Sequence, residues 1–435
     1  MGTTRPSVLD LMPLVHGIER KMSTALSLMS TGAKLTLVNS AITSMLIYAM
    51  CTLKFPPKLI EMLDRIRRRC LWIKKTDQGE KCNSLAAWDM VCKPKNRGGL
   101  GVLNLKIQNE ALLMKFLHKF FNKDDTPWVR IIWETYYQDG LPCNKLVGSF
   151  WWKGILQTLP EYKKHSRCIP GKGETILLWH DNWSDLPLHL KMPELYSFAI
   201  NKDITLNQMH EHRALENCFH RPLSQQAFTQ FNILQDQLHG LTLTDDSDKW
   251  TYTWASPNYS AMKMYKHLFA KNGAHFIFRQ LWKSNCRLRH KIFFWMLLYD
   301  RVSTRNMLHR KNMYLPDYNC ALCLDMTQET LIHVFWDCHF ALNCWNCILP
   351  NRQRGISTYD EIGMMITLLP QDLAMEIIIM GWWAIWMVRN DKIFRSSPPS
   401  LNSWKSYVQE GMQHIKLRSK EAKAAKIDQC IAQTL

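Results

Sequence analysis

Apolar residues recur at helical spacing along most of this chain. Two sets near the N-terminus follow one another at steps of three and four residues: Leu11, Leu14, Ile18 and Met22, then Leu35, Val38, Ala41 and Met45. Such spacing places each set on one face of a helix. We therefore expect residues 1–75 to be helical, with a helix from Leu59 to Trp72 after the break at Pro56-Pro57. A turn over Asn96–Gly101 and a helix over residues 111–120 follow.

The pattern changes at about residue 125, where the segments become short and rich in tryptophan. Residues 167–183 are typical of a β-hairpin, because Gly171-Lys172-Gly173 suits a turn and Thr175–Trp179 suits the returning strand. Residues 184–245 are more polar and only weakly helical. We interpret them as a connecting region.

Helical spacing returns after Trp250. We expect helices at about residues 260–270, from Phe278 to Asp300, over residues 372–395 and from Trp404 onward, with Pro398-Pro399 as a break between the last two. The predicted fold class is therefore mainly α with small β elements.

The charge balance points to a polyanionic partner. The 435 residues include 55 Lys and Arg against 37 Asp and Glu, which gives a formal net charge of +18 and a pI near 9.3. Nucleic acid is the commonest polyanion for such a chain, and an anionic membrane surface is the rival. The most apolar run, Ile377–Val388, is shorter than the ~20 residues that cross a bilayer, so we expect no membrane partner. Fourteen cysteines without a secretory signal favour reduced thiols inside the cell.

Four cysteine and histidine residues form the most specific motif. Cys320, Cys323, His333 and Cys338 have the order Cys-x2-Cys-x9-His-x4-Cys. Thiolates and an imidazole hold tetrahedral Zn²⁺, and a closed set of four protein ligands is typical of a structural site. The sequence thus predicts Zn²⁺ as the cofactor.

Two alternatives to this metal site remain open. A helix over residues 331–347 would bury His333 and Cys338 without any ion, and their separation of five residues does not suit one face of an ideal helix. The pair Cys344 and Cys347 competes for the role of ligand.

Basic residues flank the motif on two predicted helices. We predict that these residues bind nucleic acid, and that an exposed tryptophan adds base stacking. The residues are Lys283, Arg287, Arg289, Lys291, Arg301, Arg305, Arg310, Lys311 and Trp336. Apolar positions such as Leu281 and Ile292 would face inward and leave the basic side chains, His290 included, outside. Lysine and arginine would then contact phosphates with little sequence specificity. The alternative is a pair of ordinary solvated helix faces.

Polymerase chemistry needs two metal ions held by close carboxylates. The adjacent acids are Asp124-Asp125 and Asp245-Asp246, and both pairs lie in polar stretches that are typical of loops. We predict no catalytic residue in this chain.

The motifs together resemble plant LINE-type reverse transcriptases. The stretches that carry the resemblance are Gly2–Pro6, Asp10–Leu14, Gly32–Leu35, Leu63–Trp72, Gly98–Gly101, Trp152–Trp183, Leu281–Lys283, Phe293–Trp295, Arg301–Arg305, the four predicted ligands, and Trp382–Trp386 with Arg389–Asp391. The resemblance covers nearly the whole chain and implies a fragment that follows the polymerase palm. It implies a thumb-like segment (1–124), a linker with the hairpin (125–249), a zinc-binding module (250–350) and C-terminal helices (351–435).

The resemblance implies zinc-dependent binding of RNA or DNA without catalysis. One alternative is a piece of an active RNA-directed DNA polymerase whose palm lies upstream or in another chain. A functionless remnant is the other.

Overall fold

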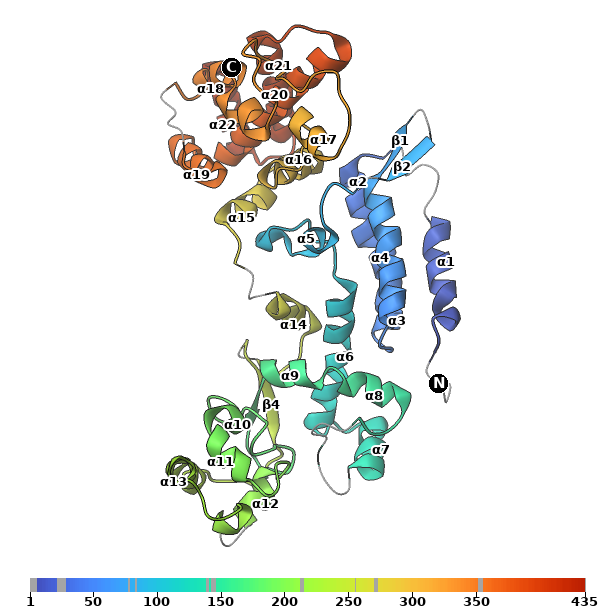
Figure 1. Ribbon diagram of the computed structural model, residues 1–435, viewed down its shortest axis with the longest axis vertical. Helices are drawn as coiled ribbons and strands as arrows, with labels where there is room; N and C mark the ends of the chain where they lie inside the picture. Colours follow the sequence, from blue (N-terminus) through green and yellow to red (C-terminus); the bar gives the residue numbers. More distant parts are fainter. Residues whose placement is uncertain are drawn as a thin grey trace. The chain divides into compact units, whose positions relative to one another are not determined.

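The structure, a computed structural model, is mostly helical with short strands (Figure 1). It describes residues 6–21, 29–76, 79–82, 84–137, 141, 146–211, 215–254, 256–269, 273–350 and 355–434, without the side chains of residues 74–82 and 433–434. The fold class expected from the sequence, mainly α with small β elements, is confirmed. Residues 2–5 of the family-like stretch and Met22 lie outside the described residues.

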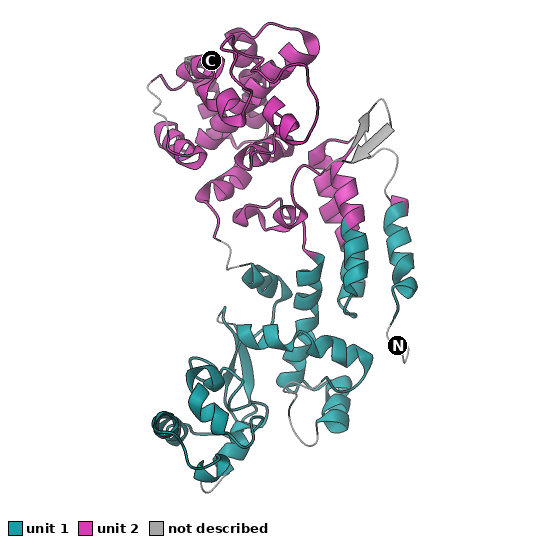
Figure 2. Ribbon diagram, viewed as in Figure 1, with its two compact units in different colours: residues 1–19, 44–64, 105–270 teal, residues 20–43, 65–104, 271–435 magenta. Residues whose placement is uncertain are grey.

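The described chain divides into two compact units (Figure 2). Unit 1 comprises residues 1–19, 44–64 and 105–270, and unit 2 comprises residues 20–43, 65–104 and 271–435. Each unit therefore draws on both halves of the sequence. The four consecutive domains expected from the sequence stay a prediction.

Unit 1 contains α3, α6 to α14, β3 and β4, with parts of α1 and α4. The bounds are α1 Met12–Lys21, α3 Thr43–Met50, α4 Pro57–Trp72, α6 Leu105–Phe121, α7 Pro127–Tyr136, α8 Phe150–Leu156, α9 Leu159–His165, β3 Ser166–Ile169, α10 Leu188–Lys191, α11 Pro193–Phe198, α12 Leu206–Glu211, α13 Gln225–His239, β4 Lys249–Tyr252 and α14 Ala261–Leu268. Short 3₁₀ turns η1 and η5 span Leu9–Leu11 and Leu215–Cys218.

Unit 2 contains α2, a short β-ribbon and the helices of the C-terminal third. The bounds are α2 Thr31–Leu37, η3 Val38–Ile42, β1 Ile73–Thr76, β2 Gly79–Cys82, α5 Trp88–Cys92, η4 Lys95–Arg97, α15 Phe276–Lys283, α16 Leu288–Leu298, α17 Arg305–Arg310, η6 His333–Asp337, α18 His339–Asn346, α19 Thr358–Leu368, α20 Ala374–Arg395, α21 Leu401–Lys416 and α22 Glu421–Thr434.

Aromatic side chains build the centre of unit 1. Phe120 stacks on Trp133 with ring centroids 4.3 Å apart, and it contacts the ring of Trp152 at 4.9 Å. The indole N–H of Trp152 donates to the hydroxyl of Tyr137 at 2.6 Å, so the polar end of this buried ring is paired. Burial of several large rings explains why the tryptophan-rich stretch folds, since each ring removes much apolar area from water.

The hairpin expected over residues 167–183 is wrong. Strand β3 pairs antiparallel with β4, far along the chain, while Ile176 and Leu178 bond to backbone groups of residues 204–206. The carboxylate of Asp248 accounts for this arrangement, because it accepts four hydrogen bonds of 2.7–2.8 Å from Gly171, Gly173 and Thr175. Residues 171–175, expected as a hairpin turn, therefore form a loop whose N–H groups surround the buried carboxylate of Asp248. Residues 184–245 are also more than a connection, since their apolar side chains join the unit 1 core.

The helix expected from Phe278 to Asp300 is also wrong, because two helices occupy this stretch. α15 ends at Lys283 and α16 begins at Leu288. Between them the backbone N–H of Asn285 donates to the buried carboxylate of Glu376 in α20 at 2.8 Å. This N–H therefore bonds to a residue distant in sequence and not to a carbonyl of its own helix. The helix can end there, and the chain turns.

The glycine turn after η4 allows a close approach to α16. Gly98 has φ of 84°, and its carbonyl accepts hydrogen bonds from the indole of Trp295 at 2.8 Å and the hydroxyl of Tyr299 at 2.9 Å. A Cβ at Gly98 would lie 2.4 Å from that hydroxyl. Only glycine fits both the backbone angle and the space.

One described stretch, Thr31–Met50, is long and apolar enough to span a membrane by length and composition, and 39% of it is buried. Core helices of soluble proteins meet the same test, so this is weak evidence for a span. The apolar run in α20 is buried as expected.

We predict that Asp248→Ala will destabilise unit 1 by about 3 kcal/mol, because it leaves buried N–H groups without an acceptor. Chemical denaturation followed by tryptophan fluorescence measures the loss. Asp246→Ala, which removes an exposed acid two residues away, is the matched control. Equal stability of the two variants would contradict the role given to Asp248.

Candidate metal centre

The first two predicted ligands lie on a tight backbone turn. Cys320 donates its N–H to the carbonyl of Thr327 at 2.8 Å, and Glu329 donates to that of Tyr318 at 2.9 Å. These bonds make a small antiparallel ladder that closes the loop. The N–H of Leu322 points at the sulfur of Cys320 at 3.4 Å, a contact that favours a thiolate.

The other two ligands lie on either side of a π-helical turn. η6 begins at His333, and the N–H of Cys338 bonds to the carbonyl of His333 at 2.7 Å. A bond between residues five apart is the π-helical pattern, which is rare and often found at functional sites. It brings together two ligands that an ideal α-helix would splay apart. The continuous ligand-burying helix expected as the alternative is therefore wrong, since the chain turns at Cys338 into α18.

The four side chains converge. Their ligand atoms all lie within 4.8 Å of one another. The sulfurs of Cys320 and Cys338 are 3.9 Å apart, and the sulfur of Cys323 is 3.2 Å from Nε2 of His333. A tetrahedral zinc ion with its usual bond lengths needs S···S edges of about 3.8 Å and S···N edges of about 3.5 Å. The donor set and the spacing therefore fit Zn²⁺.

Burial sets the protonation of the ligands before an ion binds. Burial raises the pKa of the Cys323 thiol to about 11, and the contact with Cys338 and burial raise that of Cys320 further. Burial lowers the pKa of His333, so its imidazole is neutral at pH 7 and ready to bind. A metal ion must displace the thiol protons, so its affinity falls as the pH falls.

The competing pair does not join this group. Cys344 is fully buried in α18, and the Cys347 sulfur contacts the carbonyl of Asn343. Among the described residues, the group that could hold a metal consists of the four predicted ligands.

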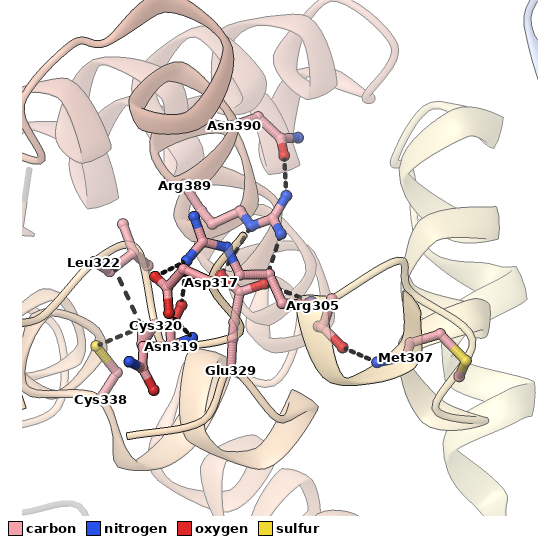
Figure 3. Close-up of polar contacts among 11 residues, drawn as sticks. Arg305, Met307, Asp317, Asn319, Cys320, Leu322, Glu329, Cys338, Arg389 and Asn390 are labelled. Atoms are coloured by element: carbon pink, nitrogen blue, oxygen red, sulfur yellow. Dashed lines mark hydrogen bonds and ion pairs between the residues drawn. The ribbon is translucent and has the colours of Figure 1, made fainter. Parts of the chain in front are cut away.

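A buried ion pair ties the metal loop to α20 (Figure 3). Both partners are nearly inaccessible, and Nη2 of Arg389 lies 2.5 Å from Oε1 of Glu329. The same carboxylate accepts the backbone N–H of Arg305 at 2.8 Å, which is the start of α17. One acid thus links the metal loop, α17 and α20. Sequence reasoning missed Glu329, since nothing local distinguishes a buried acid from an exposed one.

The expectation of an exposed Trp336 is wrong. Its side chain is 1% exposed and packs on Trp382 of α20, with ring centroids 4.6 Å apart. The indole of Trp382 in turn donates to the carbonyl of Phe335 at 3.2 Å. Because the π-helical turn directs Trp336 into the core, this ring cannot stack on a base.

The basic residues predicted to bind nucleic acid fall into two groups, one exposed to solvent and one half-buried. Lys283, Arg289, Arg310 and Lys311 are exposed, whereas Arg287, Lys291, Arg301 and Arg305 are half-buried. His290, expected on the outer face, is buried.

Several of these cations have partners within the chain. Arg305 binds the carboxylate of Asp317 and the carbonyl of Asn319, both at 2.6 Å, and so braces the metal loop. Lys291 donates to the carbonyl of Trp282 at 3.1 Å, and Arg310 pairs with Asp300. Arg305 and Lys291 are thus held by structural contacts, and their charges are less available to a ligand.

The acid pairs weighed for catalysis belong to unit 1, whereas the metal centre belongs to unit 2. The side chain of Asp125 is 89% exposed and faces Arg130 at 3.2 Å, and both Asp245 and Asp246 are exposed in the loop before β4. The absence of catalysis stays a prediction.

Comparison with known proteins agrees with the geometry. Residues 259–345 match a family described as zinc-binding in reverse transcriptase, and all four converging ligands fall within that match. The chain is also 26% identical over 392 residues, 84% of its length, to an Arabidopsis thaliana protein described as a putative ribonuclease H protein. It spans about 61% of the length of that relative.

The four converging residues therefore belong to a reverse-transcriptase zinc-binding domain and could hold its metal ion. The two matches support a relationship of the chain to the reverse transcriptases of retroelements.

We predict that Cys320→Ser with Cys323→Ser will abolish bound zinc and unfold residues 278–348, because the module loses about 10–16 kcal/mol of metal binding. Elemental analysis measures the zinc, and hydrogen exchange locates the unfolding. Cys347→Ser, a change of the same kind in a half-buried cysteine just after α18, should keep both properties. Zinc retained by the double variant would mean that the ligands are assigned wrongly.

We predict that Glu329→Ala will cost about 3–5 kcal/mol of stability in the zinc-loaded protein, because Arg389 is left buried and unpaired. Glu216→Ala breaks an exposed pair with Arg221 and should cost under ~1 kcal/mol. Denaturation curves at saturating zinc compare the two. Similar losses would show that the buried pair does not hold the metal loop to α20.

Proposed function

We propose that this chain binds RNA or DNA through a basic surface whose shape depends on bound zinc. The zinc would be a structural element, since all four coordination positions would be filled by protein and none left for a reacting water. The nucleic acid would be held through its phosphates, with low sequence specificity. No membrane partner is included in this proposal.

The convergence of four ligands inside the matched zinc-binding domain carries the proposal. The exposed cations of α15, α16 and α17, together with the net charge of +18, support a polyanionic partner. The loss of Trp336 as a stacking residue reduces the support for base contacts. Phosphate contact is therefore the main expected source of affinity.

We further propose that the chain derives from a plant LINE-type reverse transcriptase. The family-like motifs around the zinc ligands and the extent of the match with the Arabidopsis relative support this origin. On this proposal residues 1–124 correspond to the thumb-like segment that follows the palm in such polymerases, and the chain has lost that palm.

A second candidate is a part of an active RNA-directed DNA polymerase. The partial coverage of the relative favours it, because the chain spans about 61% of that protein. Genomic sequence directly upstream of Met1 that encodes a Tyr-x-Asp-Asp hairpin would support this candidate. A functionless remnant is the third reading, and the binding experiment below addresses it.

We predict that the zinc-loaded chain binds single-stranded RNA and loses affinity steeply between about 50 and 200 mM salt, because each phosphate contact releases bound counterions. Fluorescence anisotropy at several salt concentrations gives the slope of log K against log salt. The Cys320→Ser, Cys323→Ser double variant should bind more weakly with a smaller slope. Absent or salt-insensitive binding by the zinc-loaded chain would leave the remnant as the remaining interpretation.

A further inference from the structure

Arg289 of α16 is held in a fixed orientation at the surface. Its Nε donates to Nε2 of His290 at 3.0 Å, and its guanidinium lies 5.6 Å from the ring centroid of Trp383 in α20. No described residue bonds to its two terminal nitrogens. Those nitrogens form the fork that binds two oxygens of one phosphate, so the arginine is oriented for an anion that the protein itself does not supply.

His290 acts as the acceptor that positions this arginine. An arginine Nε can only donate, so Nε2 of His290 carries a lone pair and the imidazole is neutral. The ring is 1% exposed and packs on Trp383 with centroids 4.8 Å apart. Burial, then the charges of Arg289 and Arg287, lower its pKa to about 3. The histidine therefore stays neutral and keeps its acceptor role at physiological pH.

The turn between α21 and α22 brings a second arginine to this place. Asn285, just before α16, donates its side-chain N–H to the hydroxyl of Ser419 at 2.9 Å, next to Arg418. The carboxylate of Glu376 fixes the same junction, since it accepts from the backbone of Asn285 at 2.8 Å and from Lys423 at 2.7 Å. Arg418, from more than 120 residues along the chain, is therefore a neighbour of the start of α16.

The charge around this junction is unbalanced. Arg287, Arg289 and Arg418 all lower the pKa of His290, so three guanidinium charges act on this one ring. Within the described chain the three arginines have no carboxylate partner. Glu376 is already paired with Lys423, and Glu410 lies 3.5 Å from His414. The N-terminus of α16 adds a partial positive charge at the same place.

We propose that Arg287, Arg289 and Arg418 form a phosphate-binding site at the start of α16, and that it takes a phosphodiester of bound nucleic acid. Arg289 supplies the oriented fork, and Arg287 and Arg418 supply charge from the start of α16 and from the turn between α21 and α22. Of these three, Arg418 was not among the residues predicted from the sequence. The choice of nucleic acid over free phosphate rests on the proposed function.

The test uses the zinc-loaded full chain and the double substitution Arg289→Gln with Arg418→Gln. Both side chains are exposed, so the fold and the zinc content should not change. Binding of a fluorescent oligouridylate should weaken about 25-fold at ~0.1 M salt, and its salt slope should fall by about 1.4, since each single-strand phosphate contact contributes about 0.7 to that slope. Arg167→Gln, which removes the charge of another exposed arginine on β3, should change neither value.

Arg289→Lys separates orientation from charge. It keeps the cation but loses the fork and the bond to His290, so it should weaken binding while leaving the salt slope near that of the unaltered chain. Wild-type affinity in Arg289→Lys would overturn the positioning role of His290.

Inorganic phosphate distinguishes the two sources of the anion. At constant ionic strength it should raise the melting temperature of the unaltered chain and not that of the double variant. If phosphate does so but oligouridylate does not bind, the site takes free phosphate and the nucleic-acid assignment is wrong. If the double variant matches the unaltered chain with both ligands, no such site exists, and salt-dependent RNA binding by the chain would still uphold the proposed function.

Discussion

Three thiols and one imidazole that meet at one point are the constraint on which the zinc-binding module depends. They come from two short segments, the loop around Cys320 and the π-helical turn from His333 to Cys338, and neither has a strand or a long helix to hold it. The free energy of zinc binding, about 10–16 kcal/mol in comparable peptides, is as large as the whole stability of an ordinary domain. A zinc ion bound by these four residues would therefore decide whether the loop has one conformation or many.

Helix α20 connects the four-ligand group to the rest of unit 2. The ion pair of Glu329 with Arg389 joins the metal loop to this helix, and Trp382 packs against Trp336 from the π-helical turn. A second face of α20, at Trp383 and Glu376, orients Arg289 and fixes the junction before α16. The same buried helix thus supports both the metal centre and the proposed phosphate site. Loss of zinc is expected to loosen the first contact directly and the second through the helix.

The sequence predicted correctly those elements that are stabilised by residues close to them in sequence. The helical spacing of Leu59–Trp72 matches α4, and the spacing of cysteine and histidine identified a ligand set that the fold brings together. Contacts between distant residues decided the rest. Asp248 wraps the expected hairpin turn around itself, Glu376 divides the expected long helix, and the π-helical turn buries Trp336. No property of residues 167–183 or 278–300 taken alone reveals those partners.

The coordination of the metal itself is the most direct measure of this account. X-ray absorption at the zinc edge of the purified, zinc-loaded chain should show three sulfur neighbours at about 2.3 Å and one nitrogen at about 2.0–2.1 Å. Oxygen neighbours in place of sulfur, or fewer than three sulfurs, would show that Cys320, Cys323, His333 and Cys338 do not share one ion.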